Sequence, residues 1–267
     1  MLKSSYEKIS IDIANFIAMY NPTGDIDTLI KALDLENIAG PEYVAKLKEN
    51  ARCFAPENFT ADPFITNIKV KDARIGDFFL TGATYEKGEL FQYDEPDVRA
   101  DIVVPKLGFF TGPVDFPTIY EGVIPWMSVC PSEVNSMKEE MARAHGKVLV
   151  LGLGLGYFPY IISQRDDVQE ITIVEYQPEI IKLFEENIFP QFNKKDKIKI
   201  VEADAFKFMM DVEIGEYDYI FTDIWESQFD GAIAYRKIHE HEDRLQGTEF
   251  GYWIEDEILY YLEEADI

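Results

Sequence analysis

Three glycines alternate with leucines directly after a run of aliphatic residues. From Lys147 the sequence reads Lys-Val-Leu-Val-Leu-Gly-Leu-Gly-Leu-Gly-Tyr, which places glycines at Gly152, Gly154 and Gly156. Because glycine has no Cβ atom, the backbone can turn tightly there and can approach a bound molecule closely. A helix that follows such a turn directs free N–H groups and its positive dipole end to the same place. The pattern predicts a site for a nucleotide-like cofactor, although a glycine-rich turn by itself can also be a plain connection.

A carboxylate ends each of the next three predicted strands. Residues 170–175 end on Glu175, about twenty residues past the glycines, where an acid can accept hydrogen bonds from both hydroxyls of a ribose. Two further strands end on Asp204 and Asp223. A single acid at such a position is commonly a helix N-cap. An ordered series of them favours a shared site, because parallel strands present their carboxyl ends at one edge of the sheet, where open α/β sheets bind ligands.

These residues resemble the class I S-adenosylmethionine-dependent methyltransferase superfamily, and within it the branch that contains spermidine synthase. The resemblance covers about residues 131–225 and includes the run Glu175-Tyr-Gln-Pro-Glu-Ile-Ile. It also includes Val150, because this branch commonly has an aliphatic residue where the superfamily has an acid. The resemblance implies an α/β fold with a Rossmann-like parallel sheet, and S-adenosylmethionine or its decarboxylated form as the cofactor.

The resemblance also implies roles for individual positions. The glycine loop, with Leu155, would line the methionine part of the cofactor, Glu175 would bind the ribose, and Asp204 with Ala205 would lie at the adenine. Asp223 would face the reacting amine or sulfonium group and act as the catalytic residue. Three neighbours of the strand-end acids complete the set of expected cofactor- and substrate-binding residues: Tyr176, Trp225 and Glu226. The two aromatic residues among them either belong to the core or stack on adenine or on an amine cation.

The reaction implied by the resemblance is in-line displacement at a carbon bonded to positively charged sulfur. A methyltransferase that acts on an amine of a small molecule or protein is the first interpretation. An aminopropyltransferase is the second, because Leu155 stands where those enzymes usually have Asp and the run after Asp223 lacks their second Asp before a Pro. The third is a non-catalytic protein that binds the cofactor or a partner.

The composition narrows the choice of partners. Fifty acidic residues against 25 basic ones give a formal charge of −25, which repels nucleic acid and anionic membranes and attracts cationic small molecules. An acidic surface can also simply confer solubility. Two cysteines and no long apolar run predict a cytoplasmic protein. We expect no metal at His239 and His241, since residues two apart on a helix point to different faces.

Three consecutive parts are expected along the chain. Residues 1–54 have helical periodicity, and residues 55–130 carry short β-rich runs, such as 65–70 and 77–81, that suggest a small antiparallel unit. Residues 131–267 would form the Rossmann-like domain. Only residues 248–254 could add a fifth strand after Asp223, so we expect a shortened C-terminal sheet, which a partner subunit in a homo-oligomer could cap.

Overall fold

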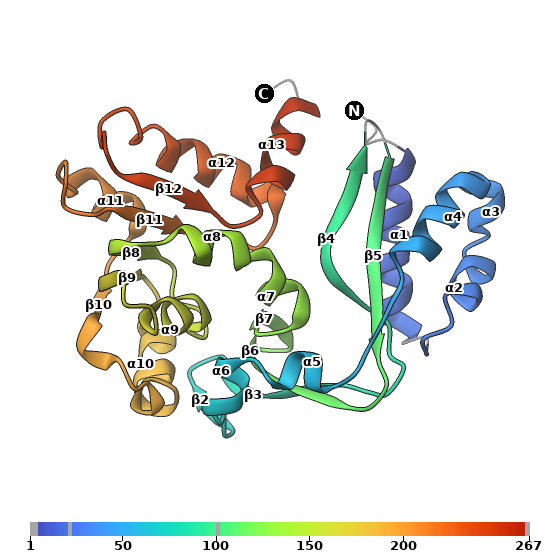
Figure 1. Ribbon diagram of the computed structural model, residues 1–267, viewed down its shortest axis with the longest axis horizontal. Coiled ribbons are helices and arrows are strands. Elements are labelled where there is room, and N and C mark those ends of the chain that lie inside the picture. The colour runs from blue at the N-terminus through green and yellow to red at the C-terminus, as the bar shows by residue number, and fades with distance from the viewer. Residues whose placement is uncertain (1–4, 21–22, 100–101, 265–267) are drawn as a thin grey trace. The chain divides into compact units, whose positions relative to one another are not determined.

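Five parallel strands form the sheet that carries the predicted strand-end residues (Figure 1). They are β8 (Gly146–Leu151), β9 (Val168–Glu175), β10 (Ile198–Glu202), β11 (Tyr219–Thr222) and β12 (Glu249–Tyr252). Their order in the sheet is β10-β9-β8-β11-β12, and each neighbouring pair is parallel. The strand order reverses between β8 and β11, as in doubly wound sheets. The Rossmann-like α/β fold predicted from the sequence is confirmed.

The structure is a computed structural model that describes residues 5–20, 23–99 and 102–264. Within these residues the parallel sheet has five strands, and β12 lies inside the predicted stretch 248–254. The shortened sheet is therefore as expected. In the part of the chain described here, no helix is long and apolar enough to cross a membrane.

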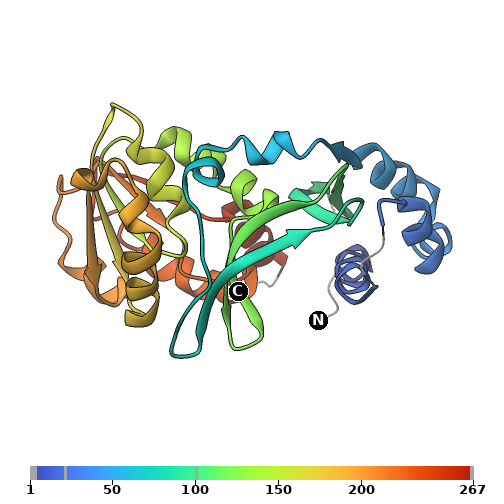
Figure 2. The ribbon, with the colours of Figure 1, turned by 90° about the horizontal axis from the view of Figure 1, so that it is seen from below.

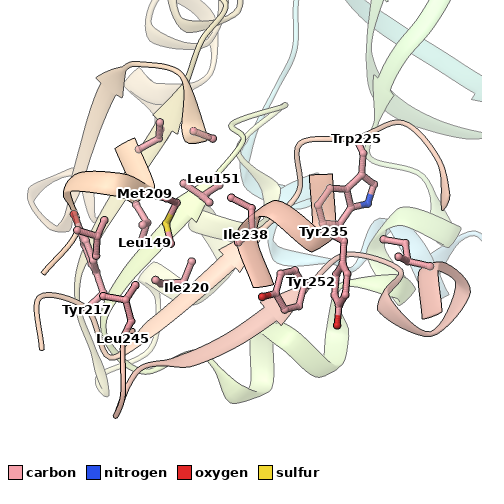
Figure 3. Close-up of a cluster of buried hydrophobic side chains, with 14 of the residues drawn as sticks. Leu149, Leu151, Met209, Tyr217, Ile220, Trp225, Tyr235, Ile238, Leu245 and Tyr252 are labelled. Atoms are coloured by element: carbon pink, nitrogen blue, oxygen red, sulfur yellow. The ribbon is translucent and has the colours of Figure 1, made fainter. Parts of the chain in front are cut away.

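Both faces of the parallel sheet are covered, which explains why its strands are apolar at consecutive positions. On one face, Leu149, Leu151 and Ile220 are fully buried in a cluster with side chains of α11, α12 and α13 (Figure 3). On the other face, Phe221 stacks on Phe158 of α9 with ring centroids 4.0 Å apart. Each such buried side chain contributes about 1.5–3 kcal/mol of stability.

The helices of this region alternate with the strands. They are α8 (Lys138–Arg143), α9 (Tyr157–Ser163), α10 (Pro178–Asn187), α11 (Ala205–Asp211), α12 (Gln228–His239) and α13 (Glu255–Glu264), with 3-10 turns η1 (Phe189–Gln191) and η2 (Lys195–Lys197). A capping box of Ser227 and Asp230 begins α12. Such a cap satisfies N–H groups at the helix start that would otherwise have no partner.

Two smaller sheets precede the parallel one in the sequence. The first has the order β2 (Ala73–Ile75), β3 (Phe78–Tyr85), β6 (Val114–Glu121) and β7 (Ile124–Ser128), with β3 and β6 side by side (Figure 2). The second has the order β1 (Arg52–Phe54), β5 (Ile102–Phe110) and β4 (Phe91–Arg99). In the second sheet β4 is antiparallel to β5, whereas β1 is parallel to it.

The strand predicted over residues 65–70 is wrong. Its first part belongs to α6 (Pro63–Asn67), which buries Phe64. The reason is local: the Asp62 carboxylate accepts hydrogen bonds from the N–H groups of Phe64 and Ile65, at 2.8 and 3.3 Å. Pro63 starts the helix, where a missing N–H costs nothing.

The remaining helices are α1 (Ser5–Tyr20), α2 (Ile26–Ala32), α3 (Leu35–Ile38), α4 (Gly40–Asn50), α5 (Glu57–Thr60) and α7 (Pro131–Ser136). The first four share a core with strand β5. Two compact units result. One contains the described residues of Met1–Ile65, Ala83–Phe116 and Cys130–Asn135, and the other contains those of Thr66–Gly82, Pro117–Val129 and Ser136–Ile267. The first unit thus draws on all three consecutive parts expected from the sequence, and the second draws on residues 55–130 and 131–267.

Candidate functional site

Gly152 and Asp223 meet where the strand order of the parallel sheet reverses. The N–H of Asp223 donates to the carbonyl oxygen of Leu151, at 2.9 Å, and continues the pairing of β11 with β8. Gly152 has a φ of 100°, and a Cβ atom there would overlap the Asp223 carbonyl oxygen. Main chain therefore contacts main chain at this point, and only glycine fits at position 152.

The carboxyl of Asp223 differs from the carboxylates of Glu175 and Asp204, which accept main-chain hydrogen bonds. The residue keeps some exposed surface, and no described residue donates a hydrogen bond to its side chain. Burial among protein atoms, together with the negative charge of Glu175, raises the pKa of Asp223 to about 7. A carboxyl with this pKa exists in both protonation states near neutral pH, so it can take up and release a proton.

Glu175 ends β9 and is 4% exposed. One of its carboxylate oxygens accepts the N–H of Leu153, at 3.1 Å, and the other accepts the N–H groups of Tyr176 and Gln177, both at 2.8 Å. Burial raises the pKa of Glu175, and these three hydrogen bonds oppose the rise. The carboxylate thus holds the glycine loop to the end of β9. Its predicted contact with a ribose stays a prediction.

The glycine loop follows β8 and leads into α9. Gly154 and Gly156 both have positive φ, of 52° and 75°. A Cβ atom at Gly154 would overlap the thioether of Met127, and one at Gly156 would overlap the ring of Phe184. The protein's own packing therefore requires both glycines. Leu155 between them is fully buried, so its side chain is not available to a ligand.

Two of the residues predicted to contact adenine follow β10. Asp204 is the N-cap of α11, and its carboxylate accepts the N–H groups of Phe206 and Lys207, at 2.9 and 3.1 Å. Ala205 is buried, whereas Tyr176 at the end of β9 is 64% exposed. Asp204 therefore serves as a helix N-cap, which is the structural alternative that the sequence left open for a strand-end acid. The adenine contacts of Asp204 and Ala205, and the stacking of Tyr176 on adenine or on an amine cation, stay predictions.

The two residues after Asp223 that were expected to bind substrate lie in different surroundings. Trp225 is 6% exposed and belongs to the core cluster of Figure 3, where its ring packs close to Gly231 of α12. Its buried indole N–H has no hydrogen-bond partner among the described residues. Glu226 is exposed, and its main-chain N–H donates to Asp230 at 2.8 Å. Their contacts with a substrate stay predictions.

Two residues near the site were not found from the sequence. Met127 of β7 accepts a hydrogen bond from the N–H of Leu155, at 3.2 Å. Thr222 precedes Asp223, and its fully buried hydroxyl has no partner among the described residues. A methionine in a strand carries no sequence signal for such a contact. Threonine is common in strands in general, so Thr222 carries no sequence signal for a site either.

The acidic histidine-containing segment after α12 forms pairs within itself. His239 contacts the Glu242 carboxylate at 2.9 Å, and His241 contacts the guanidinium of Arg244 at 2.9 Å. Within residues 5–20, 23–99 and 102–264, no group of three or more His, Cys, Asp or Glu side chains could hold a metal ion.

Comparison with known families gives a match over the region that contains the glycine loop and the strand-end acids. Residues 133–236 match the family model described as the spermine/spermidine synthase domain. This segment is therefore similar to the spermine/spermidine synthase domain. The resemblance stated from the sequence is confirmed at that level. No curated protein is significantly similar to the chain.

Several solved structures are similar to part of this chain. Spermidine synthase from Thermotoga maritima is 17% identical, with 46% of this chain and 48% of that chain covered and a TM-score of 0.33. A spermidine synthase in complex with the transition state analogue AdoDATO is 17% identical, with 48% of each chain covered and a TM-score of 0.35. A protein of the NADB-Rossmann superfamily from Streptococcus agalactiae is 15% identical, with 49% and 58% covered and a TM-score of 0.35. The chain thus spans about half the length of these structures.

Proposed function

We propose that this protein is a transferase that binds an adenosyl sulfonium compound at the carboxyl edge of its parallel sheet, and that it transfers a methyl group from S-adenosylmethionine to an amine of a small molecule or protein. The carboxyl of Asp223 is the observation that carries the proposal. It lies where the strand order reverses, receives no hydrogen bond from any described residue and has a pKa of about 7. Ligands of doubly wound sheets bind at this point.

The chemistry of the site suits a cationic ligand. Asp223 and Glu175 lie close enough for the charge of Glu175 to affect the pKa of Asp223, and Glu175 is buried whereas Asp223 is half-buried. A positive charge placed between them would favour ionisation of both carboxyls. A sulfonium compound supplies such a charge, together with a carbon that is activated for displacement. The match of residues 133–236 to the spermine/spermidine synthase domain supports the same class of ligand.

Asp223 would serve the reaction by taking a proton from the acceptor. An alkylamine has a pKa of about 10 and is protonated at neutral pH, so it must lose a proton before it can attack carbon. The Asp223 carboxylate takes that proton, directly or through water. The amine nitrogen then forms a bond to carbon as the carbon–sulfur bond breaks, with its electron pair going to sulfur. Asp223 is then neutral, and the carboxylate of Glu175 stays ionised and stabilises the cationic nitrogen that develops.

An aminopropyltransferase is the second candidate, and the family match favours it. Methyl transfer ranks first because Leu155 takes the place of the Asp that aminopropyltransferases usually have. The Leu155 side chain is apolar and fully buried, so it cannot replace that carboxylate. The two reactions need different cofactors: methyl transfer uses S-adenosylmethionine, and aminopropyl transfer uses the decarboxylated compound.

The experiment that tests the proposal is a turnover assay with each cofactor and a panel of amines and basic peptides, read by product mass. We expect addition of one carbon with S-adenosylmethionine, and loss of the product in Asp223→Asn. Addition of an aminopropyl group would instead establish the second candidate. Binding of a cofactor without any turnover would identify a non-catalytic protein, and absence of binding would overturn the proposal.

A further inference from the structure

An irregularity in the β6–β7 hairpin directs Met127 at the glycine loop. The cross-strand pairs are Thr118–Ser128, Ile119–Met127 and Tyr120–Pro125. Trp126 is therefore an extra residue on β7 without an opposite partner, which is a β-bulge. Its ring packs edge-on against Phe78 of β3, with centroids 5.6 Å apart, and holds the bulge in place. Bulges change the direction of neighbouring side chains and occur often beside functional sites.

The thioether of Met127 lies on the main chain of the glycine loop. The N–H of Leu155 donates to the Met127 sulfur at 3.2 Å, and a Cβ atom at Gly154 would overlap that sulfur. The absence of a side chain at Gly154 thus makes room for Met127. Both segments belong to the same compact unit of the chain.

The glycine loop has two N–H groups that contact side chains from elsewhere in the chain, and their acceptors differ in strength. The N–H of Leu153 donates to the Glu175 carboxylate, which is a strong acceptor. The N–H of Leu155 donates to the Met127 thioether, which is a weak one. A ligand group with an oxygen acceptor would therefore displace Met127 at far lower cost than it would displace Glu175.

We propose that Met127 is a specificity-determining residue, whose side chain covers the part of the glycine loop on which the amino-acid chain of an adenosyl ligand would lie. This inference rests on the proposed function. A ligand that extends over Gly154 must displace the thioether, whereas a nucleoside that reaches only Glu175 and Asp204 need not. Met127 therefore weakens binding of the full adenosyl compound and leaves binding of adenosine unchanged.

The test is calorimetric titration of the full-length wild-type protein and Met127→Ala with S-adenosylmethionine and with adenosine. We expect Met127→Ala to bind S-adenosylmethionine about 5–10-fold more tightly, because the fraction of molecules with an uncovered loop rises. Adenosine should bind both proteins equally. Met127→Leu retains the bulk of the side chain but lacks the sulfur acceptor, so it should gain less than Met127→Ala. Met210→Ala is the matched control, because Met210 on α11 is 68% exposed.

A second readout does not depend on ligand binding. Hydrogen exchange at the Leu155 amide should be at least about tenfold faster in Met127→Ala than in the wild type, because the amide loses its acceptor. Equal exchange rates, or equal affinities of the two proteins for S-adenosylmethionine, would overturn the role of Met127 and leave the proposed function intact. If no protein bound either compound, the proposed function would fail, and the role of Met127 with it.

Discussion

Asp223 at the end of β11 and Glu175 at the end of β9 are electrostatically coupled. Burial of the Asp223 carboxyl and the negative charge of Glu175 raise the pKa of Asp223 to about 7. Glu175 is fixed by three main-chain hydrogen bonds, whereas the Asp223 carboxyl has none from the described residues. Because of this difference in hydrogen bonding, Glu175 is held in place by the main chain. Asp223 is the acid of the pair that can take up and release a proton near neutral pH.

Replacement of Asp223 by Asn should abolish proton acceptance while the shape of the site is preserved. We expect kcat/KM for amine transfer to fall by about 10²–10⁴-fold, which is the usual contribution of a general base. The affinity for the sulfonium cofactor should fall by less than kcat/KM does, because the charge of Glu175 remains. Asp211→Asn, which removes one exposed carboxylate at the end of α11, is the control. An active Asp223→Asn enzyme would assign the base to another residue.

The raised pKa of Asp223 predicts a specific dependence of stability on pH. The folded-state pKa of about 7 exceeds the ordinary value of 3.8, so between these pH values the folded protein binds more protons than the unfolded chain. The contribution of Asp223 to stability is therefore fully present below about pH 4 and is lost as the pH rises through 7.

Urea unfolding from pH 4 to pH 8 measures this loss. Wild-type stability should fall relative to that of Asp223→Asn by about 2–4 kcal/mol over this range, since each pKa unit corresponds to about 1.4 kcal/mol. The free energy of unfolding of Asp211→Asn, plotted against pH, should run parallel to that of the wild type. This control accounts for the loss of one negative charge. Parallel curves for the wild type and Asp223→Asn would show that the Asp223 pKa is not raised.

Substitution of Gly152 by Ala should be strongly destabilising. Its φ of 100° is unfavourable for any side chain, and the added Cβ would overlap the main-chain carbonyl of Asp223, which cannot move without disturbing β11. We expect a loss of about 2–4 kcal/mol in thermal or chemical unfolding. Gly247→Ala is the control: it has a similar φ of 94° but nothing within 4 Å of the added Cβ, so it should lose only about 1–2 kcal/mol. Equal losses would refute the close contact at Gly152.

Substitution of Trp225 by Phe should cost little stability for a buried aromatic residue. Its indole N–H is buried without a partner among the described residues, so its removal relieves a desolvation penalty of about 1–3 kcal/mol that offsets the lost packing. Tyr252→Phe makes a useful comparison, because the Tyr252 hydroxyl donates to Glu242 at 2.7 Å and its loss should destabilise the protein. A large loss in Trp225→Phe together with a small one in Tyr252→Phe would contradict this view. A raised KM in a stable Trp225→Phe protein would support the predicted substrate contact.

The sequence predicted the parallel sheet well because four of its strands, β8 to β11, combine a β-branched or aliphatic run with a glycine or an acid at or just after their end. Even β12 was located, within residues 248–254. The strand predicted at 65–70 failed because Asp62 and Pro63 form a local helix start, which outweighs the β-branched residues that follow.

The site was predictable to the extent that it depends on strand ends. Asp223, Glu175 and Gly152 lie together because parallel strands align their carboxyl ends. The contact of Met127 with the glycine loop depends on a bulge at Trp126, and a bulge is defined by the pairing of two strands rather than by the residues of one. Whether Trp225 would face the core or the ligand depends on the backbone of a loop, which the residue types do not determine.

The most direct test of the central claim is calorimetric titration of the wild-type protein and Glu175→Gln with S-adenosylmethionine, its decarboxylated form and NAD. The account predicts that one or both sulfonium compounds bind the wild type, that NAD does not, and that Glu175→Gln weakens the binding by about tenfold or more, because a neutral amide replaces a charged acceptor. Binding of NAD alone, or equal binding of the sulfonium compounds by both proteins, would contradict the claim that such a ligand lies at this edge of the sheet.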